Sequence, residues 1–104
     1  MILTTTETVP KKEITEIIGI ARGSTVRAKS VASDFIAGLK NFVGGEIDEY
    51  TKLQGNSREQ ALQRMVDYGK KLGADAIVNI RFTTSTIAQG ASEILAYGTA
   101  VKLN

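Results

Sequence analysis

The fold is decided by residues 76–103, which read AIVNIRFTTSTIAQGASEILAYGTAVKL. From Ala76 to Ile87, apolar and polar residues alternate, which is the pattern of a β-strand with one buried face. The dipeptide Gln89-Gly90 then separates this run from a second one over 91–103. Two such runs joined by a short glycine-containing turn predict an antiparallel hairpin.

The register of this hairpin is predicted from its apolar residues. A tight turn at Gln89-Gly90 keeps the apolar side chains of both strands on one side of the sheet. A slip of one residue would move the apolar set of one strand to the other side. The predicted facing pairs are Val78 with Val101, Ile80 with Thr99, Phe82 with Tyr97 and Thr84 with Leu95.

Two further β-patterns precede the helical part of the chain. Residues 2–6 predict a short strand, since threonine and isoleucine suit a pleated surface. Residues 14–29 predict a long strand whose alternation breaks at Ile17-Ile18, so that its apolar face changes sides. A bulge or a sharp bend would restore the register, and the glycines placed to accommodate it are Gly19 and Gly23.

Two helices are predicted between the strands. Residues 31–43 carry apolar side chains at helical spacing, Ser30 is a suitable N-cap, and Gly44-Gly45 ends the helix. A second helical pattern covers 46–72 and is interrupted at Gln54-Gly55-Asn56. Either one long helix tolerates the glycine at a cost of about 1 kcal/mol, or two helices meet there. We prefer the continuous or slightly kinked helix.

The predicted order of elements is β-β-α-α-β-β, in a single domain over residues 1–104. Strand runs that flank a run of helices are typical of the α+β class. We therefore expect an antiparallel sheet of about four strands with helices on one face. A hydrophobic content of 42% and a charged content of 23% are those of an ordinary globular protein.

The amino-acid composition excludes several kinds of functional site. The chain has no cysteine and no histidine, which excludes disulfides, thiol nucleophiles, the commonest general base and the usual ligands of zinc and copper. We therefore expect neither a cofactor nor enzymatic activity. The net charge is only +2 and adjacent basic residues are few, so nucleic-acid binding is not expected. The sequence shows no secretory signal and no apolar stretch of about 20 residues, which favours a cytoplasmic location away from membranes.

Several segments form a recognisable set in order along the chain: Thr4-Thr5-Thr6, Gly23 to Val26, Asn41-Phe42-Val43-Gly44-Gly45-Glu46, Tyr50, Arg58, Met65, Gly73-Ala74-Asp75-Ala76, Arg81-Phe82 and Glu93 to Val101. Together they resemble the YbjQ-like family, bacterial and archaeal proteins that carry a heavy-metal-binding label and are otherwise largely uncharacterised. The resemblance implies a dodecin-like α/β subunit that assembles into a ring, expected to be a pentamer, with short added strands joining neighbours. It implies no established activity and no catalytic residues.

The donor atoms of this chain do not suit the metals of that label. Heavy metals favour thiolate and imidazole ligands, whereas carboxylate oxygens suit calcium, magnesium or manganese. Glu46, Asp48 and Glu49 open the second predicted helix and are the candidate metal ligands, especially if ring symmetry gathers several copies. Alternatively, these acidic side chains only stabilise the positive end of the helix dipole.

Polar side chains of the hairpin are the candidates for a ligand site. Asn79 and Arg81 lie on the polar face of the first strand, where Arg81 offers a forked donor to a carboxylate or phosphate. Alternatively, Arg81 pairs with an acidic neighbour. Glu93 and Tyr97 share a face of the last strand, and a buried carboxylate near a phenol can perform acid–base catalysis. The alternative for this pair is a hydrogen bond across strands.

The leading functional hypothesis is a homo-oligomeric binding or scaffold module. The wide apolar stripe of 31–43 and the two-sided isoleucines of 14–29 exceed what one sheet needs. A neighbouring copy would cover them, and cyclic symmetry would close the assembly, with any ligand between subunits or on the axis. Two alternatives stay open: a protein that binds a hard cation or another metal, and a small enzyme with an inter-subunit site of Glu93, Tyr97 and Arg81.

Overall fold

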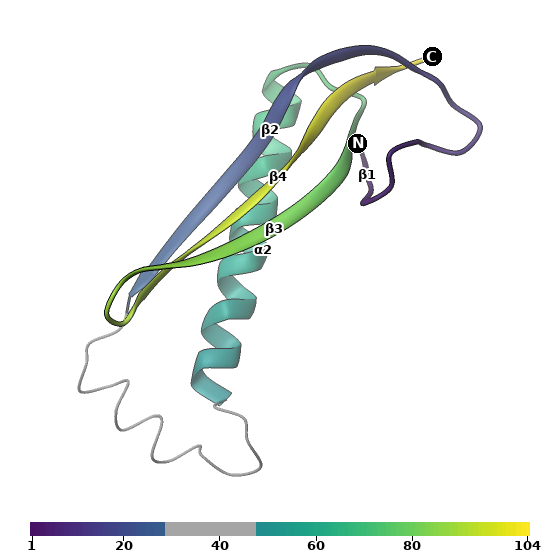
Figure 1. Ribbon diagram of the computed structural model, residues 1–104. Helices are drawn as coiled ribbons and strands as arrows, with labels where there is room; N and C mark the ends of the chain where they lie inside the picture. The colour runs from purple at the N-terminus through teal and green to yellow at the C-terminus, as the bar shows by residue number, and fades with distance from the viewer. Residues whose placement is uncertain (29–47) are drawn as a thin grey trace.

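The computed structural model describes residues 1–28 and 48–104, which form a four-stranded sheet and one long helix (Figure 1). The α+β class is thereby confirmed. The helix predicted over 31–43, with its cap Ser30 and its terminating Gly44-Gly45, lies outside the described residues. The elements are β1 (Ile2–Leu3), β2 (Ile14–Ala28), α2 (Asp48–Lys71), β3 (Ala76–Ala88) and β4 (Ala91–Leu103).

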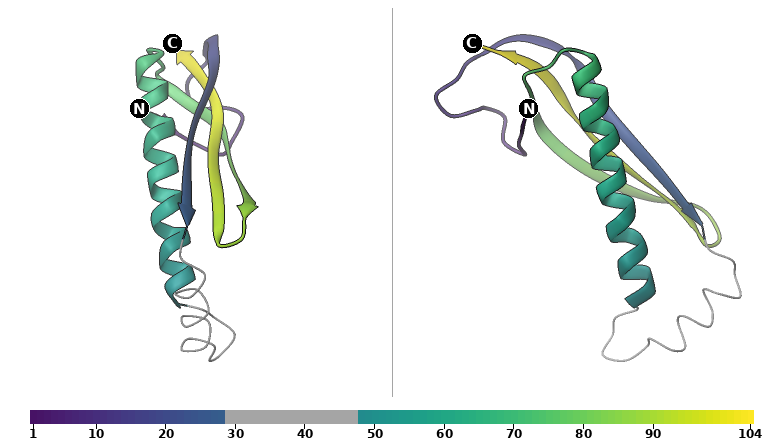
Figure 2. Two further views of the ribbon diagram at one scale, coloured as in Figure 1. Left: turned by 90° about the vertical axis from the view of Figure 1, so that its left-hand side faces the viewer. Right: turned by 180° about the vertical axis from the view of Figure 1, so that it is seen from behind.

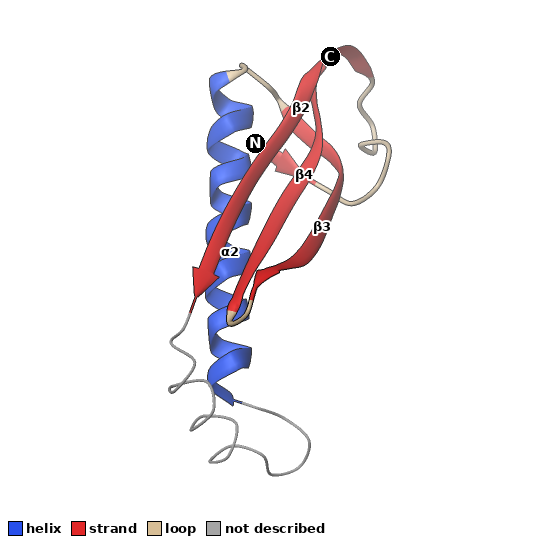
Figure 3. Ribbon diagram, turned by 60° about the vertical axis from the view of Figure 1, so that its left-hand side comes forward, coloured by secondary structure: helices blue, strands red, loops and turns tan. Residues whose placement is uncertain are grey.

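The sheet has the order β1-β3-β4-β2 and is mixed, because β1 runs parallel to β3 (Figure 3). The prediction of a purely antiparallel sheet is wrong at this strand. A short turn forces two strands to be antiparallel, but β1 is separated by the whole sheet from β2, the strand that follows it in sequence. Its direction is therefore not fixed by any hairpin.

The ladder of β1 is shorter than the predicted 2–6, because the threonines after it bond differently. They attach to β3 where that strand is irregular, and the chain then crosses to the far edge of the sheet. The main-chain bonds run from Thr4 N to Ile77 O at 3.1 Å, from Ile80 N to Thr4 O at 3.1 Å and from Asn79 N to Thr6 O at 2.9 Å.

The β3–β4 hairpin forms as predicted, but its register is different. Val78 lies opposite Thr99 instead of Val101, since the ladder shifts between Val78 and Arg81 and again near the turn. Each extra residue on β3 displaces the pairing with β4 by one position. The alternation of apolar and polar residues along one strand does not reveal such a displacement. Val78 and Ile80, predicted to share a face, consequently belong to separate core clusters. The remaining predicted pairs are displaced as well, with Phe82 opposite Ala96 and Thr84 opposite Ile94.

The long strand β2 is irregular where its sequence predicts it. Its ladder with β4 shifts near the start of the strand and again between Ile17 and Gly19. Beyond this point the isoleucines divide between the two sides of the sheet. Ile18 packs against the helix-side core, whereas Ile20 is 62% exposed. The break in alternation thus correctly indicates a change of face.

The helix α2 lies along one face of the sheet and contributes Ala61 and Met65 to the main core (Figure 2). It runs from Asp48 to Lys71 without a break at Gly55, which confirms the continuous helix. The cluster between helix and sheet is made of alanines, isoleucines and one methionine: Ala21, Ala61, Met65, Ile77, Ile80, Ile94, Ala96 and Ala100.

Helix and sheet approach most closely at Gly23 in the middle of β2. A Cβ atom built there would lie 2.5 Å from the carbonyl oxygen of Ala61 and 2.7 Å from the carbonyl carbon of Arg64, and closer still to the amide nitrogen of Met65. Since real Cβ atoms do not approach backbone atoms to 2.5 Å, only glycine fits at this position with α2 where it is.

A second core cluster lies on the opposite face of the sheet, at one end. Val9, from the segment that connects β1 to β2, packs there with Ala76, Val78 and Val101. Asn104 ties the end of this segment to β4, because its amide donates to the Glu13 carbonyl at 3.1 Å and its side-chain oxygen accepts from the Glu13 amide at 3.0 Å. The connecting segment therefore covers only part of this face.

The rest of that surface, which we call the open face, turns away from α2 and exposes large apolar side chains. Ile17, Ile20 and Val26 on β2 are 71%, 62% and 54% exposed, and Tyr97 on β4 is 39% exposed. Their register partners place them on this side: Ile20 faces Thr99 and Val26 faces Glu93, away from the helix-side alanines of β4. The apolar excess inferred from the sequence of 14–29 is therefore present in the folded strand.

Candidate functional site

A bulge in β3 shapes the centre of the open face. Between the pairs Val78–Thr99 and Arg81–Tyr97, two residues of β3 face Gly98 alone on β4. A Cβ at Gly98 would lie 2.9 Å from the Val78 carbonyl oxygen, so any side chain there would push the bulge away. Gly98 therefore permits the bulge, with its one extra residue, to pass close to β4.

The bulge depends equally on Asn79. Its φ of 59° is in the left-handed region, which asparagine tolerates better than most residues because its short polar side chain can bond locally. The Asn79 amide donates to the Thr6 carbonyl at 2.9 Å, so the segment after β1 holds this conformation from outside the sheet. As a result, Asn79 and Arg81 both face the same side as Tyr97.

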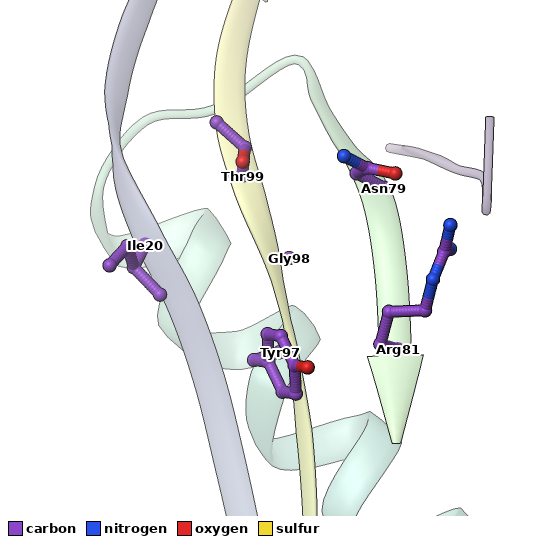
Figure 4. A pocket seen from close by; sticks show the side chains of 6 residues that line it. All are labelled: Ile20, Asn79, Arg81, Tyr97, Gly98 and Thr99. Carbon is purple, nitrogen blue, oxygen red and sulfur yellow. The ribbon is translucent and has the colours of Figure 1, made fainter. Parts of the chain in front are cut away.

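These residues border a pocket of about 340 Å³ on the open face (Figure 4). Three strands contribute to it, with β3 on one side, β4 across the middle and β2 on the other side. The polar groups come from β3 and β4, whereas β2 contributes only an aliphatic side chain. The lining residues are Ile20, Asn79, Arg81, Tyr97, Gly98 and Thr99.

Arg81 is the charged residue of this lining, and its guanidinium is held at the rim by main-chain acceptors. Nη1 donates to the Ile80 carbonyl at 2.8 Å and to the Thr5 carbonyl at 3.1 Å. Carbonyl oxygens orient the group without neutralising its charge. In residues 1–28 and 55–104, whose side chains the structure describes, Arg81 forms no ion pair, so the positive charge at the rim of the pocket is uncompensated there.

Three of the four predicted ligand residues meet in this pocket, namely Asn79, Arg81 and Tyr97. Glu93 does not line it, although it shares the open face. Tyr97 lies four positions beyond Glu93 along β4, a span of roughly 14 Å at about 3.4 Å per residue. Within one chain, the carboxylate and the phenol are therefore too far apart to act on one substrate atom.

The remaining lining residues were not predicted as site residues. Thr99 was expected to face Ile80, and Ile20 was interpreted only as part of an apolar excess. Gly98 carried a signal that could have located the site, because a glycine inside a strand often marks a bulge. A bulge opposite it would have placed Asn79 and Arg81 beside Tyr97.

The metal site predicted at Glu46, Asp48 and Glu49 stays a prediction, because the structure does not describe these three side chains. Glu46 lies outside the described residues, and Asp48 and Glu49 begin α2. No cluster of three or more aspartate, glutamate, histidine or cysteine residues that could hold a metal ion occurs among residues 1–28 and 55–104, whose side chains the structure describes. With no histidine or cysteine in the whole sequence, the donor set does not fit a heavy metal.

The fold and its pocket define a small α+β protein in which a sheet carries a helix on one face and a polar pocket on the other. The chain belongs to the family whose model is described as "Putative heavy-metal-binding", which matches residues 1–104. This confirms the family predicted from the sequence. The description names a metal class that the donor atoms of this chain do not suit.

Relatives of similar length occur in archaea and bacteria. The chain is 61% identical to a UPF0145 protein of Archaeoglobus fulgidus, over 99% of this chain and 95% of the relative. It is 54% identical to a UPF0145 protein of Methanosarcina acetivorans over 99% of this chain and 97% of the relative. A UPF0145 protein of Vibrio parahaemolyticus is 56% identical over 99% of this chain and 98% of the relative.

The fold is similar to that of a solved structure. A protein of unknown function from Pediococcus pentosaceus, assigned to the DUF74 family, superimposes with a TM-score of 0.70 over 100% of this chain and 98% of that chain. The sequences are 16% identical, so this likeness concerns the fold. In the described residues, no helix has the length and apolarity needed to cross a membrane.

Proposed function

We propose that this protein is a cytoplasmic, homo-oligomeric binding module, in which five copies form a ring and ligand sites lie on the open face near subunit boundaries. The observation that carries the proposal is the exposure of Ile17, Ile20 and Val26, each more than half exposed on a folded strand. Water contact with three aliphatic side chains on one strand is unfavourable, and a second copy would remove it.

The two edges of the sheet support pairing between copies. At one edge, β2 extends from Ile14 to Ala28 and no strand bonds to its outer side in the described part of the chain. At the other edge, β1 and the threonines after it cover β3 only as far as Ile80. No strand among the described residues bonds to the outer side of Arg81–Ala88. Unpaired edges of this kind readily add a strand from another chain.

The edges belong to different strands, and this favours a ring over a symmetric dimer. If the β2 edge of one copy met the β3 edge of the next, each copy would use two different surfaces. Head-to-tail contacts of this type close into rings when the rotation between copies allows it. The number five comes from the family resemblance, and the ring is the arrangement in which Ile20 and the pocket lie near a subunit boundary.

A binding role without catalysis fits the pocket lining. The lining provides a guanidinium, an amide, a hydroxyl and a phenol, and none of its residues is a carboxylate, thiol or imidazole. Such groups recognise and orient a ligand. The hard-cation and enzyme alternatives have no comparable support among the side chains of residues 1–28 and 55–104, where Glu93 lies apart from the pocket and no metal cluster is found.

Native mass spectrometry tests the assembly directly. Five copies of the 11.2 kDa chain give a species of about 56 kDa at micromolar concentration. Ile17→Lys and Ile20→Lys place a charge at positions that are exposed in one chain, so each is expected to shift the mass to 11.2 kDa without unfolding the subunit. Asn56→Lys, an exposed position on α2, is the control with the same added charge and is expected to keep the oligomer.

A wild-type protein that stays at 11.2 kDa would overturn the proposal. A closed assembly with another number of copies would reject the pentamer and keep the shared open face. An oligomer that survives both lysine substitutions would show that the open face of β2 is not the contact.

A further inference from the structure

We infer that the pocket at the β3 bulge binds an organic oxyanion, a small molecule whose carboxylate or phosphate group pairs with Arg81 while its planar apolar part lies against Tyr97. The residues that form the pocket belong to one chain, so this inference goes beyond the proposed ring and does not require it.

The charge of the pocket selects the anion. Arg81 has five N–H donors, and the two bonds from Nη1 to main-chain carbonyls fix the plane of the guanidinium. Nε and Nη2 donate to no group in the described part of the chain, and these two nitrogens form the fork that matches two oxygens of a carboxylate or phosphate. A preoriented donor loses little freedom when the anion binds.

Two neutral groups beside Arg81 complete the polar side of the pocket. The amide of Asn79 can donate to an anion oxygen, and the hydroxyl of Thr99 can donate or accept. In Figure 4 both lie around Gly98 together with the phenol of Tyr97. No acidic side chain lines the pocket, so nothing in the lining would repel an anion.

The other side of the pocket is apolar and defines the rest of the ligand. Tyr97 is 39% exposed and offers its ring to a bound molecule, and Ile20 borders the same pocket from β2. A flat ring stacks well on a tyrosine. A volume of about 340 Å³ is at the lower end for small-molecule pockets, which span roughly 300–1,000 Å³, and suits one ring that carries one anionic group.

The test titrates the full-length, isotope-labelled protein and follows its backbone amides by NMR. The probes are phenyl phosphate and benzoate, which distinguish the two oxyanions, and inorganic phosphate and phenol, which each supply one half of the ligand. We expect saturable shifts at Asn79, Arg81 and Tyr97 with at least one of the two combined probes. That probe should bind roughly tenfold more tightly than inorganic phosphate or phenol, since both halves of the pocket contribute.

Substitutions at Arg81 and Tyr97 separate the contributions of these two side chains to probe binding. Arg81→Gln should weaken the binding of the effective probe at least tenfold, because a charged hydrogen-bonding partner is lost. Arg58→Gln makes the same charge change at an exposed position on α2 and should leave the affinity unchanged. Tyr97→Leu should remove the advantage over inorganic phosphate and leave the binding of inorganic phosphate itself unaltered.

A second variant keeps the test decisive if Arg81→Gln fails to fold. Asn79→Asp retains a residue that tolerates a φ of 59° and places a carboxylate beside Arg81, so anion binding should be lost in a folded protein. The inference is overturned if no probe gives saturable shifts at the pocket, or if Arg81→Gln and Arg58→Gln bind equally. It is also overturned if Arg81→Gln dissociates the oligomer and leaves probe binding intact, because Arg81 would then serve a neighbour's carboxylate.

Discussion

Replacing Gly23 with alanine tests the packing of α2 on the sheet. The added Cβ would lie 2.5 Å from the Ala61 carbonyl oxygen, whereas ordinary contacts begin near 3.4 Å. The obstacle is helix backbone, which has no rotamer to change. The helix must therefore move by roughly 1 Å, and the cluster around Met65 must open with it.

The cost of this substitution is expected at the upper end of overpacking, about 3 kcal/mol. For a domain of this size, 1 kcal/mol corresponds to roughly 4–8 °C in Tm, so the expected decrease is about 12–24 °C. The matched control is Gly55→Ala on α2. Its Cβ would have the end of the flexible Arg58 side chain at 3.8 Å as its nearest neighbour in the described residues. Because alanine is the better helix former, this control should gain up to about 1 kcal/mol.

Thermal unfolding followed by circular dichroism measures both variants, at the same subunit concentration as the wild type because assembly makes Tm concentration-dependent. We expect Gly23→Ala to lower the Tm and Gly55→Ala to raise it. If Gly23→Ala unfolds within a few degrees of the wild type, α2 does not pack on β2 as closely as the structure shows, and the reasoning is refuted.

Three further substitutions have expected effects on stability. Met65→Ala empties a site with 0% exposure in the main core and should cost about 2–5 kcal/mol in urea unfolding; a loss below 1 kcal/mol would contradict its central position. Thr25→Val replaces a buried hydroxyl that has no hydrogen-bond partner in the described part of the chain, so it should raise stability by about 1 kcal/mol, and a loss would mean that the hydroxyl is bonded. Val9→Ala should speed hydrogen exchange of the segment between β1 and β2 while leaving α2 unchanged; equal effects on both would show that the two core clusters are not separate.

Much of the fold was predictable because its signals are local. The hairpin of β3 and β4, the irregular β2 and the continuous α2 each follow from periodicity or turn residues within one segment. The direction of β1 was not predictable in this way, since it depends on a contact with β3 more than 70 residues away in sequence. The predicted register of the hairpin was wrong for a related reason. A bulge depends on the residues of both paired strands, and the pattern along one strand does not reveal it.

The candidate site was predicted in part, and its residues show why. Asn79, Arg81 and Tyr97 could be selected because polar and aromatic side chains on a strand are chemically conspicuous. Thr99 and Ile20 are ordinary strand residues, and only the observed register brings them to the same pocket. Glu93 was selected on equal grounds to Tyr97, but the distance along β4 excludes it from the pocket.

The left-handed backbone at Asn79 has a consequence for reading sequence variation among relatives. A preference for asparagine, aspartate or glycine at this position would arise from the φ of 59° alone, whether or not any molecule binds there. Thr99 stands opposite Val78 beside the bulge, but its own φ is not in the left-handed region, so its backbone accepts almost any residue. Invariance at Thr99 would therefore be the more informative sign of selection for a ligand.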